Sequence, residues 1–559
     1  MTPSWLHSAV LYQLYPQSFC DSNGDGIGDL AGILGKLDYL QALGVDAIWI
    51  NPCFVSPFQD AGYDVSDYYR IAPRYGTNED AHALFTEAHR RGMKILLDLV
   101  AGHTSIENRW FRDSCKHARN EYSDWYIWTD SGWTWEAPGL RLINGYAERD
   151  ASYAVNFFYC QPALNYGFAK PDSKYPWQQG VDAPGPRRVR GELRAIMKFW
   201  LDLGCDGFRV DMAASLVKND PGWRETIKLW REIRAWLEDD YPQAALVSEW
   251  SHPPSALRAG FHADFPLHFG SAGYSSLFRK QYPGNAAADP SGHSFFETAG
   301  RGNIRTFLDD YEPWLRATRG KGLMSLVSGN HDMTPRLSQG RTADDLELCF
   351  LFLLTMPGMP CIYYGDEIGM RTQEQLPSKE GGLGRTGVRT PMSWSGERGA
   401  GFSSAPPEKF YLPADPAPEC PNVSAQEADP ASLLQRIRRM TALRRAHPAL
   451  QGEGGYRTVY GEAGKYPYVY ARSTPEETIW IALNPSRQPA DVVLAKSVSG
   501  KEMKVETLYG ADGAFMQERD GLHLKLTGVS GGVYKVTGST VKINPRRTQR
   551  TRKIKAKTR

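Results

Sequence analysis

The stretch CDGFRVDM, residues 205–212, alternates the apolar side chains of Phe208 and Val210 with the charged side chains of Arg209 and Asp211. A short apolar run that starts at a glycine is typical of a buried β-strand. Seven other runs of this kind occur along the chain: AVLYQLYP at 9–16, VDAIWINP at 45–52, MKILLDLV at 93–100, AALVSEW at 244–250, FHADF at 261–265, LMSLVSGNHD at 323–332 and MPCIYYGDE at 359–367. Helical stretches separate these runs, so the sequence predicts an α/β fold, a (β/α)8 barrel of the TIM type.

Polar residues stand where several of these runs end. His103 follows the third run, Asp211 and Glu249 end the fourth and fifth, and Asp332 ends the seventh. In a barrel of this type the active site gathers at the carboxyl ends of the strands. A single carboxylate after a strand is more often a helix N-cap or a surface charge. Three carboxylates from three strands indicate a catalytic site.

The segments between the runs predict further domains. Residues 104–175 are crowded with Trp, Tyr, Gly and Pro and lack a helical period, which indicates an inserted subdomain after the third strand. A helix that contains Leu433 and Leu443 and ends before Pro448 is expected to complete the barrel. The alternating run TIWIALNPS begins a C-terminal all-β sandwich. We therefore predict a catalytic barrel over 1–103 and 176–450, an inserted domain over 104–175 and a β-domain over 451–540.

Composition excludes several classes of protein. The 559 residues carry a formal net charge of +2, but the terminal stretch RRTQRTRKIKAKTR holds eight basic residues and no acidic one, which leaves −6 for the rest. This tail lacks apolar periodicity, so we predict a disordered segment over 541–559 and no nucleic-acid partner. No apolar run is long enough to span a bilayer, and the first residues lack the pattern of a secretory signal, so no membrane partner is expected.

The eight cysteines occur singly, without a C-x-x-C pair or a zinc-finger spacing. This usage is typical of reduced thiols in a cytoplasmic protein. The sequence leaves the oligomeric state open.

The stretch DSNGDGIGDL, residues 21–30, places oxygen ligands at every second residue. Its beginning resembles an EF-hand loop, but the twelfth position is Gly32 instead of a bidentate glutamate, and no second hand occurs. Alternating oxygen ligands still suit a hard cation such as calcium, with magnesium as the other possibility. A solvated turn rich in Asp and Asn is the alternative. The candidate ligands are Asp21, Asn23, Asp25, Asp29 and the carbonyl oxygen of Ile27.

Several motifs together resemble the α-amylase superfamily of glycoside hydrolases, family 13, and especially its oligo-1,6-glucosidase and trehalose-synthase-like branch. The motifs are DLVAGH at 98–103, GFRVD at 207–211, SEW at 248–250 and GNHD at 329–332. They are supported by GVDAIWINP at 44–52, QPALN at 161–165 and GMPCIYYGDE at 358–367, all in the order of the family. The resemblance covers about residues 5–540.

The resemblance implies that Asp211 is the nucleophile, Glu249 the general acid and base, and Asp332 the third carboxylate that holds sugar hydroxyls. Retaining glycoside hydrolysis uses one carboxylate that attacks and a second, about 5–5.5 Å away, that protonates the departing oxygen. Asp211 must therefore be ionised and Glu249 protonated. Arg209, two residues before Asp211 on the same strand face, is expected to keep Asp211 charged, while burial raises the pKa of Glu249.

The resemblance also implies a pocket for one terminal glucose. Tyr63, His103 and His331 match positions that contact sugar hydroxyls in the family. Asp60 and Arg389 match residues that hold the terminal glucose in this branch. A small oligosaccharide or disaccharide is the expected partner, and the cation of the Asp-rich loop is expected to be structural.

The chain departs from the family pattern at three positions: the first predicts that the usual metal site between barrel and inserted domain is absent, and the other two leave the linkage open. Gly102 stands where amylases place a calcium-binding asparagine, Ala163 where this branch usually has an aspartate, and Met212 where valine or threonine often follows the nucleophile. We expect a retaining, exo-acting α-glucosidase that acts on short α-glucosides by double displacement. A transglycosylase or isomerase of the trehalose synthase or sucrose isomerase type is the alternative. The retained carboxylates argue against a non-catalytic relative.

Overall fold

Eight short parallel strands form the centre of the fold. The computed structural model describes residues 2–267, 272–279, 292–495, 504–510, 514–518 and 521–537. The strands are β1 (Leu11–Leu14), β2 (Ala47–Ile50), β5 (Lys94–Leu99), β8 (Gly207–Val210), β9 (Ala245–Ser248), β10 (Ala263–Asp264), β11 (Leu323–Met324) and β12 (Cys361–Tyr363). They neighbour one another in chain order, β12 pairs with β1, and a parallel bridge between Val327 and Cys361 closes the ring. The predicted barrel is confirmed, and each strand lies in one of the eight apolar runs.

Local sequence explains how β8 fits between its neighbours. Gly207 has φ +141°, and a Cβ atom there would lie 2.1 Å from the carbonyl oxygen of Ala245 on β9. Only glycine allows this approach, which brings Arg209 into register with Val247. Strands buried on both faces read as nearly continuous apolar runs, as these do.

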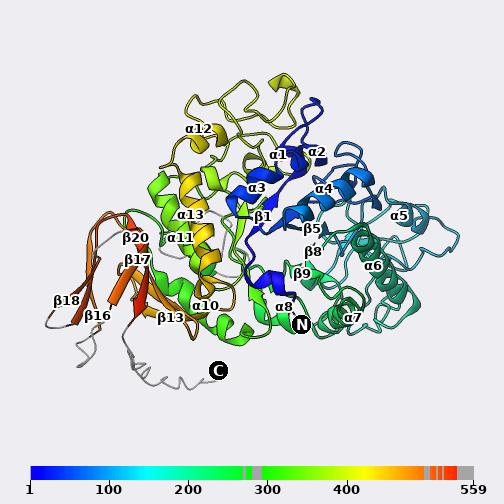
Figure 1. Ribbon diagram of the computed structural model, residues 1–559. Helices are drawn as coiled ribbons and strands as arrows, with labels where there is room; N and C mark the ends of the chain where they lie inside the picture. The colour runs from blue at the N-terminus through cyan, green and yellow to red at the C-terminus, as the bar shows by residue number, and fades with distance from the viewer. Residues whose placement is uncertain are drawn as a thin grey trace, which may run out of the picture.

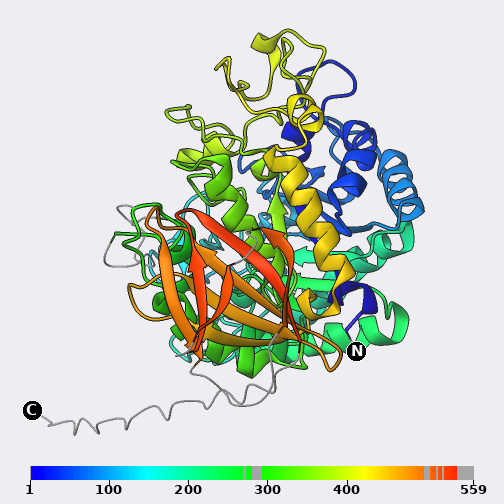
Figure 2. The same ribbon diagram turned by 60° about the vertical axis from the view of Figure 1, so that its left-hand side comes forward.

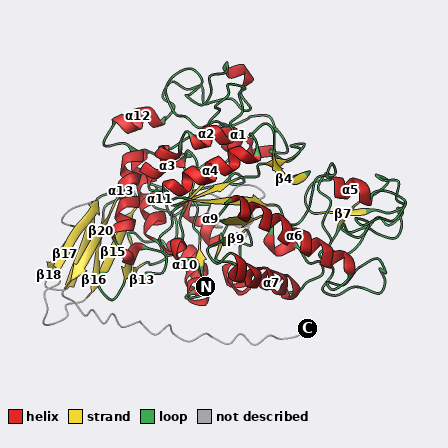
Figure 3. Cartoon of the chain, turned by 45° about the vertical axis from the view of Figure 1, so that its right-hand side comes forward, coloured by secondary structure: helices red, strands yellow, loops and turns green. Residues whose placement is uncertain are grey.

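Helices surround the strands (Figures 1 and 3). The main ones are α3 (Leu37–Leu43), α4 (Asn78–Arg90), α6 (Pro184–Leu203), α7 (Arg224–Asp240), α8 (Pro253–Arg258), α10 (Ile304–Thr318), α11 (Ala343–Thr355) and α13 (Leu433–Ala446). Shorter helices are α1 (Pro16–Phe19), α2 (Leu30–Leu34), α9 (Ala272–Phe278) and α12 (Val423–Ala428). Capping boxes at Thr77 and Thr342 start α4 and α11 by satisfying free backbone N–H groups. No helix within the described ranges is both long enough and apolar enough to cross a membrane.

A long connection leaves the barrel between β5 and β8. It contains α5 (Arg109–Ser114) and the antiparallel pair β6 (Arg141–Ile143) and β7 (Tyr153–Val155), and it extends to one side of the barrel in Figure 1. An aromatic cluster that includes Phe111, Trp128 and Tyr153 forms its interior. A second pair, β3 (Phe54–Val55) and β4 (Asp67–Ile71), follows β2. The limits of the inserted domain, residues 104–175, remain a prediction from the sequence.

Antiparallel strands follow α13, as Figure 2 shows. One sheet has the order β13 (Gly455–Tyr460), β14 (Tyr468–Ser473), β15 (Thr478–Asn484), β20 (Ser530–Thr537) and β17 (Lys504–Gly510). The other contains β16 (Ala490–Ala495), β19 (Gly521–Leu526) and β18 (Phe515–Glu518). The predicted C-terminal all-β domain is confirmed. The predicted basic tail, 541–559, lies outside the described residues.

Candidate active site

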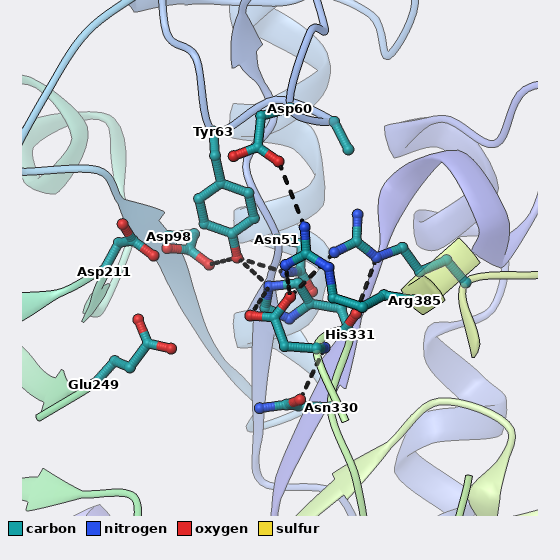
Figure 4. Close-up of polar contacts among 12 residues, drawn as sticks. Asn51, Asp60, Tyr63, Asp98, Asp211, Glu249, Asn330, His331 and Arg385 are labelled. Carbon is teal, nitrogen blue, oxygen red and sulfur yellow. Dashed lines mark hydrogen bonds and ion pairs between the residues drawn. The ribbon is translucent and has the colours of Figure 1, made fainter. Parts of the chain in front are cut away.

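Three carboxylates meet at the carboxyl end of the barrel. Asp211 directly follows β8, Glu249 directly follows β9, and Asp332 lies in the loop after β11. All three line one cavity of about 500 Å³, together with Asp60, Tyr63, His103 and His331. Figure 4 shows Asp211 and Glu249 on one side of Tyr63 and Arg385 on the other. Of the residues that we expected at the pocket, Arg209 and Arg389 are buried behind its wall.

A single guanidinium group holds the two central carboxylates in place. Arg209 donates from Nη1 to Asp98 Oδ1 at 2.8 Å and to Asp211 Oδ1 at 3.0 Å. Its Nη2 atom lies 2.9 Å from Glu249 Oε2. The expectation that Arg209 favours the charged form of Asp211 alone is therefore incomplete, because the same group contacts Glu249 equally closely.

The charges of this cluster do not balance. One arginine faces the carboxylates of Asp98, Asp211 and Glu249, all at most 8% exposed. Burial is the main cause that raises the pKa of Asp211 and of Glu249, and Arg209 opposes it in both cases. Both shifts favour the protonated form of the carboxyl group, and a protonated carboxyl group can act as a general acid.

Asp332 has the opposite electrostatic environment. Its Oδ1 atom accepts hydrogen bonds from Arg385 Nη1 at 2.5 Å and from Arg389 Nη2 at 3.1 Å. Burial alone would raise the pKa of Asp332, but His331, Arg385 and Arg389 outweigh it and hold the pKa well below its usual range. Asp332 is consequently ionised.

Tyr63 and His331 are hydrogen-bonded to each other and separate the carboxylates around Arg209 from Asp332 (Figure 4). The Tyr63 hydroxyl donates to Asp98 Oδ2 at 2.9 Å, accepts from Asn51 Nδ2 at 3.0 Å and lies 2.7 Å from His331 Nε2. Gln13 Nε2 lies 2.8 Å from His331 Nδ1, so the amide donates to Nδ1 and the ring proton is on Nε2. Burial lowers the pKa of His331 far below 6.5, which keeps this ring neutral.

His103 and Asp60 complete the pocket. His103 Nε2 lies 3.0 Å from the carbonyl oxygen of Tyr63, and burial lowers the pKa of His103 to about 4. Asp60 Oδ2 accepts from Gln161 Nε2 at 2.7 Å, and burial raises the pKa of Asp60 to about 6. Arg385 Nη2 lies 3.9 Å from Asp60 Oδ1. Arg385 therefore lies between Asp60 and Asp332.

Sequence reasoning missed three residues of this site. Asp98 is the only charged side chain in the otherwise apolar core of its strand, ILLDL, which is a signal that could have found it. Gln161 is the first residue of the motif QPALN, which supported only the resemblance to the family. Arg385 lies in the 3-10 helix Leu383–Val388, which ends just before Arg389. The sequence around Arg385 contains no predicted strand that could have indicated its position.

The Asp-rich loop lies before α2, apart from the pocket. Asp21 Oδ1 accepts from the backbone N–H groups of Asn23 and Gly24, and Asp21 Oδ2 accepts from Gly26. Asp29 caps α2 by accepting from Gly32 at 2.6 Å. No group of three or more His, Cys, Asp or Glu side chains suited to a metal occurs in the part of the chain that the structure describes. These contacts are typical of a turn rich in Asp and Asn, and the calcium ion stays a prediction.

A lysine ammonium group occupies the junction near Gly102. Lys218 Nζ donates to Asn156 Oδ1 at 2.9 Å and to the carbonyl oxygen of Ser215 at 2.8 Å. Asn156 in turn donates to the carbonyl oxygen of Gly102 at 2.8 Å. Burial lowers the pKa of Lys218 to about 8. The inserted segment is thus linked to the barrel by a side-chain cation, next to the bridge between His103 and Ala163.

Comparison with known proteins agrees with this geometry. The profile of the α-amylase catalytic domain matches residues 13–453. Trehalose synthase from Pimelobacter sp. is 32% identical over 550 residues, which cover 88% of this chain and 89% of that enzyme. Oligo-1,6-glucosidase from Parageobacillus thermoglucosidasius is 31% identical over 547 residues, which cover 86% of this chain and 90% of that enzyme.

Solved structures of sugar isomerases share the whole fold. Isomaltulose synthase from Protaminobacter rubrum superposes with a TM-score of 0.77 at 26% identity and covers 96% of this chain and 100% of its own. Trehalulose synthase from Pseudomonas mesoacidophila gives a TM-score of 0.76 at 27% identity, and the match covers 95% of this chain and 99% of that enzyme. The matched catalytic domain spans most of the chain, and the chain therefore belongs to the α-amylase family of glycoside hydrolases.

Proposed function

We propose that the protein is a retaining, exo-acting α-glucosidase that cleaves short α-glucosides. The observation that carries this proposal is the charged end of the pocket, where Arg385 lies between Asp60 and Asp332 and Arg389 supports Asp332 from behind. Such groups hydrogen-bond the hydroxyls of a terminal sugar ring. A polysaccharide that continued past this point would leave buried charges without partners, which costs binding energy.

In the first step Asp211 attacks the anomeric carbon and Glu249 protonates the departing oxygen. Glu249 Oε2 accepts from Met212 N at 3.0 Å and contacts Arg209, so Oε1 is the atom that can carry the proton. Arg209 likewise occupies Oδ1 of Asp211, which leaves Oδ2 for attack. The product is a glucosyl ester of Asp211.

Asp332 binds the sugar throughout this step. Because its pKa is held low, Asp332 accepts hydrogen bonds from ring hydroxyls and stabilises the positive charge that develops at the anomeric carbon. Arg389, buried behind the pocket wall, supports Asp332 by donating to its Oδ1 atom at 3.1 Å. The neutral rings of His103 and His331 line the cavity without adding charge.

In the second step Glu249, now a carboxylate, removes a proton from the acceptor that attacks the ester. Water as the acceptor gives hydrolysis, and a sugar hydroxyl gives transfer or isomerisation. The similarity to trehalose synthases and to sugar isomerases favours a second candidate function, in which the released sugar is kept and rejoined. One of the similar solved structures contains the substrate sucrose, which supports a disaccharide as substrate in either case.

The test is product analysis with maltose, isomaltose, sucrose, trehalose and soluble starch. Exo-acting retention predicts free glucose from short substrates, with the α-anomer first in proton NMR and little loss of starch viscosity. A rapid fall in viscosity without free glucose would mean internal cleavage and contradict the pocket argument. A new disaccharide in place of glucose would assign the second candidate function.

We also propose a cytoplasmic location and a structural calcium ion at the Asp-rich loop. All eight cysteines are free thiols, as expected in a reducing compartment. Asp21 and Asp29 are buried in the loop and supply carboxylate oxygens of the type that calcium prefers. Such an ion would stabilise the fold without taking part in bond cleavage.

A further inference from the structure

A second cavity lies at the amino end of the barrel strands, opposite the catalytic pocket. Its volume is about 630 Å³, compared with about 500 Å³ for the pocket. Helix α10 and strand β13, which lie side by side in Figure 1, form its two long walls. Residues just before β11 and β12, including Gly322 and Gly358, form its floor. This size is typical of a site for a small metabolite.

Four arginines line this cavity, and three of them have no ion-pair partner among the described residues. Arg305 on α10 pairs with Asp309. In the described ranges, no carboxylate lies within ion-pair distance of the other three. These are Arg316 on α10, Arg319 at its C-terminal end and Arg457 on β13, all exposed.

The two acidic residues of the lining are already engaged. Glu312 accepts a hydrogen bond from Thr458 Oγ1 at 2.8 Å, and Glu453 lies 3.4 Å from His7 Nδ1. Four arginines against two glutamates still leave the lining with an excess of positive charge toward any ligand that enters the cavity.

Two further guanidinium groups lie directly behind the floor. Arg444 donates to the carbonyl oxygen of Gly358 at 2.6 Å, and Arg472 donates to that of Gly454 at 3.2 Å. Both arginines are at most 1% exposed, and they donate hydrogen bonds to backbone carbonyl oxygens. Burial lowers the pKa of Arg444 to about 9 and that of Arg472 to about 10. Carbonyl dipoles only partly offset these charges, so the floor is positive as well.

A purely structural explanation covers only part of this arrangement. Arg444 and Arg472 bind carbonyl oxygens at the C-terminal end of α11, which is a favourable place for a cation. The same explanation applies to Arg316, in the last turn of α10, and to Arg319, its C-cap, but not to Arg457 on β13; all three line the cavity. Leu315 and Tyr456 add apolar surface to the lining.

We propose that this cavity binds a phosphomonoester of a small metabolite. Arg316, Arg319 and Arg457 bind the phosphate, because planar guanidinium groups match the geometry of phosphate oxygens. Leu315 and Tyr456 contact the organic part of the ligand. The site is separate from the catalytic pocket and does not depend on the reaction proposed above.

Isothermal titration calorimetry at low salt tests this proposal. The probes are glycerol 3-phosphate and inorganic phosphate, with glycerol and an ionic-strength-matched chloride solution as controls. We expect saturable 1:1 binding of glycerol 3-phosphate, weaker binding of inorganic phosphate and none with either control. Arg316→Gln combined with Arg457→Gln should weaken binding at least about tenfold.

Matched variants locate the site. Arg224→Gln removes an exposed arginine from α7, outside the cavity, and should leave the affinity unchanged. Glu249→Gln alters only the catalytic pocket and should also leave it unchanged, so failure of the catalytic assignment would not affect this result. Arg319→Gln provides an independent second variant if the double variant folds poorly. Absence of saturable binding, or unchanged affinity in the cavity variants, would overturn the proposal.

Discussion

Replacing Asp60 by Asn should stabilise the fold at neutral pH while weakening substrate binding. Asp60 is 7% exposed, and burial raises its pKa from the ordinary value of 3.8 to about 6. The difference between these values corresponds to about 3 kcal/mol of unfolding free energy at pH 7. Because the folded-state pKa is the higher one, this penalty is absent below about pH 4, grows up to about pH 6 and is constant above it.

The assay is urea unfolding of wild type and Asp60→Asn between about pH 4 and pH 7, together with kcat/KM for p-nitrophenyl α-glucoside. We expect the variant to gain up to about 3 kcal/mol at pH 7 and nothing near pH 4, while its KM rises. In the variant, the side-chain amide oxygen at position 60 can still accept the hydrogen bond from Gln161, so the pocket should keep its shape.

Asp64→Asn is the matched control for this prediction. The Asp64 carboxylate accepts from Ser56 Oγ and from the backbone N–H groups of Gln59 and Asp60. In Asp64→Asn an NH2 group replaces one of these accepting oxygens and points at a backbone N–H or hydroxyl donor. The variant should therefore be less stable than the wild type. If Asp60→Asn were no more stable than wild type at pH 7, the charged form of Asp60 would carry no penalty, and our explanation of its raised pKa would be refuted.

Asp211→Asn and Glu249→Gln should each lower kcat by about 10³-fold or more in steady-state assays, because each removes one half of the double displacement. α-Glucosyl fluoride should restore turnover of Glu249→Gln but not of Asp211→Asn, and wild-type rates in either variant would contradict the assignment. Arg385→Gln should raise the KM for maltose about tenfold by removing a charged hydrogen bond, whereas Arg385→Lys should lose less; an unchanged KM in Arg385→Gln would remove this residue from the site. Chelation, or Asp21→Ala with Asp25→Ala, should lower the melting temperature more than the initial activity, and immediate loss of activity at an unchanged melting temperature would show that the cation is catalytic.

Sequence alone determined the barrel and most of the pocket. Parallel strands that are buried on both faces require apolar runs, which are readable without any knowledge of packing. The carboxyl ends of such strands meet at one face, so the positions of Asp211, Glu249 and Asp332 in the sequence already implied that they lie together. Tyr63, His103 and His331 were located by resemblance, and the structure places all three at the cavity.

Tertiary structure decided which charges these groups hold. Arg209 and Asp98 are 111 residues apart, and Arg385 and Asp332 are 53 apart, so no local pattern predicts either contact. Arg385 reaches the pocket from a 3-10 helix whose path depends on the surrounding loops. A carboxylate's pKa depends on how completely it is buried and on which charges lie within a few ångströms. Both are properties of the packed chain, which is why the raised pKa values of Asp211 and Glu249 and the lowered pKa of Asp332 emerged only from the fold.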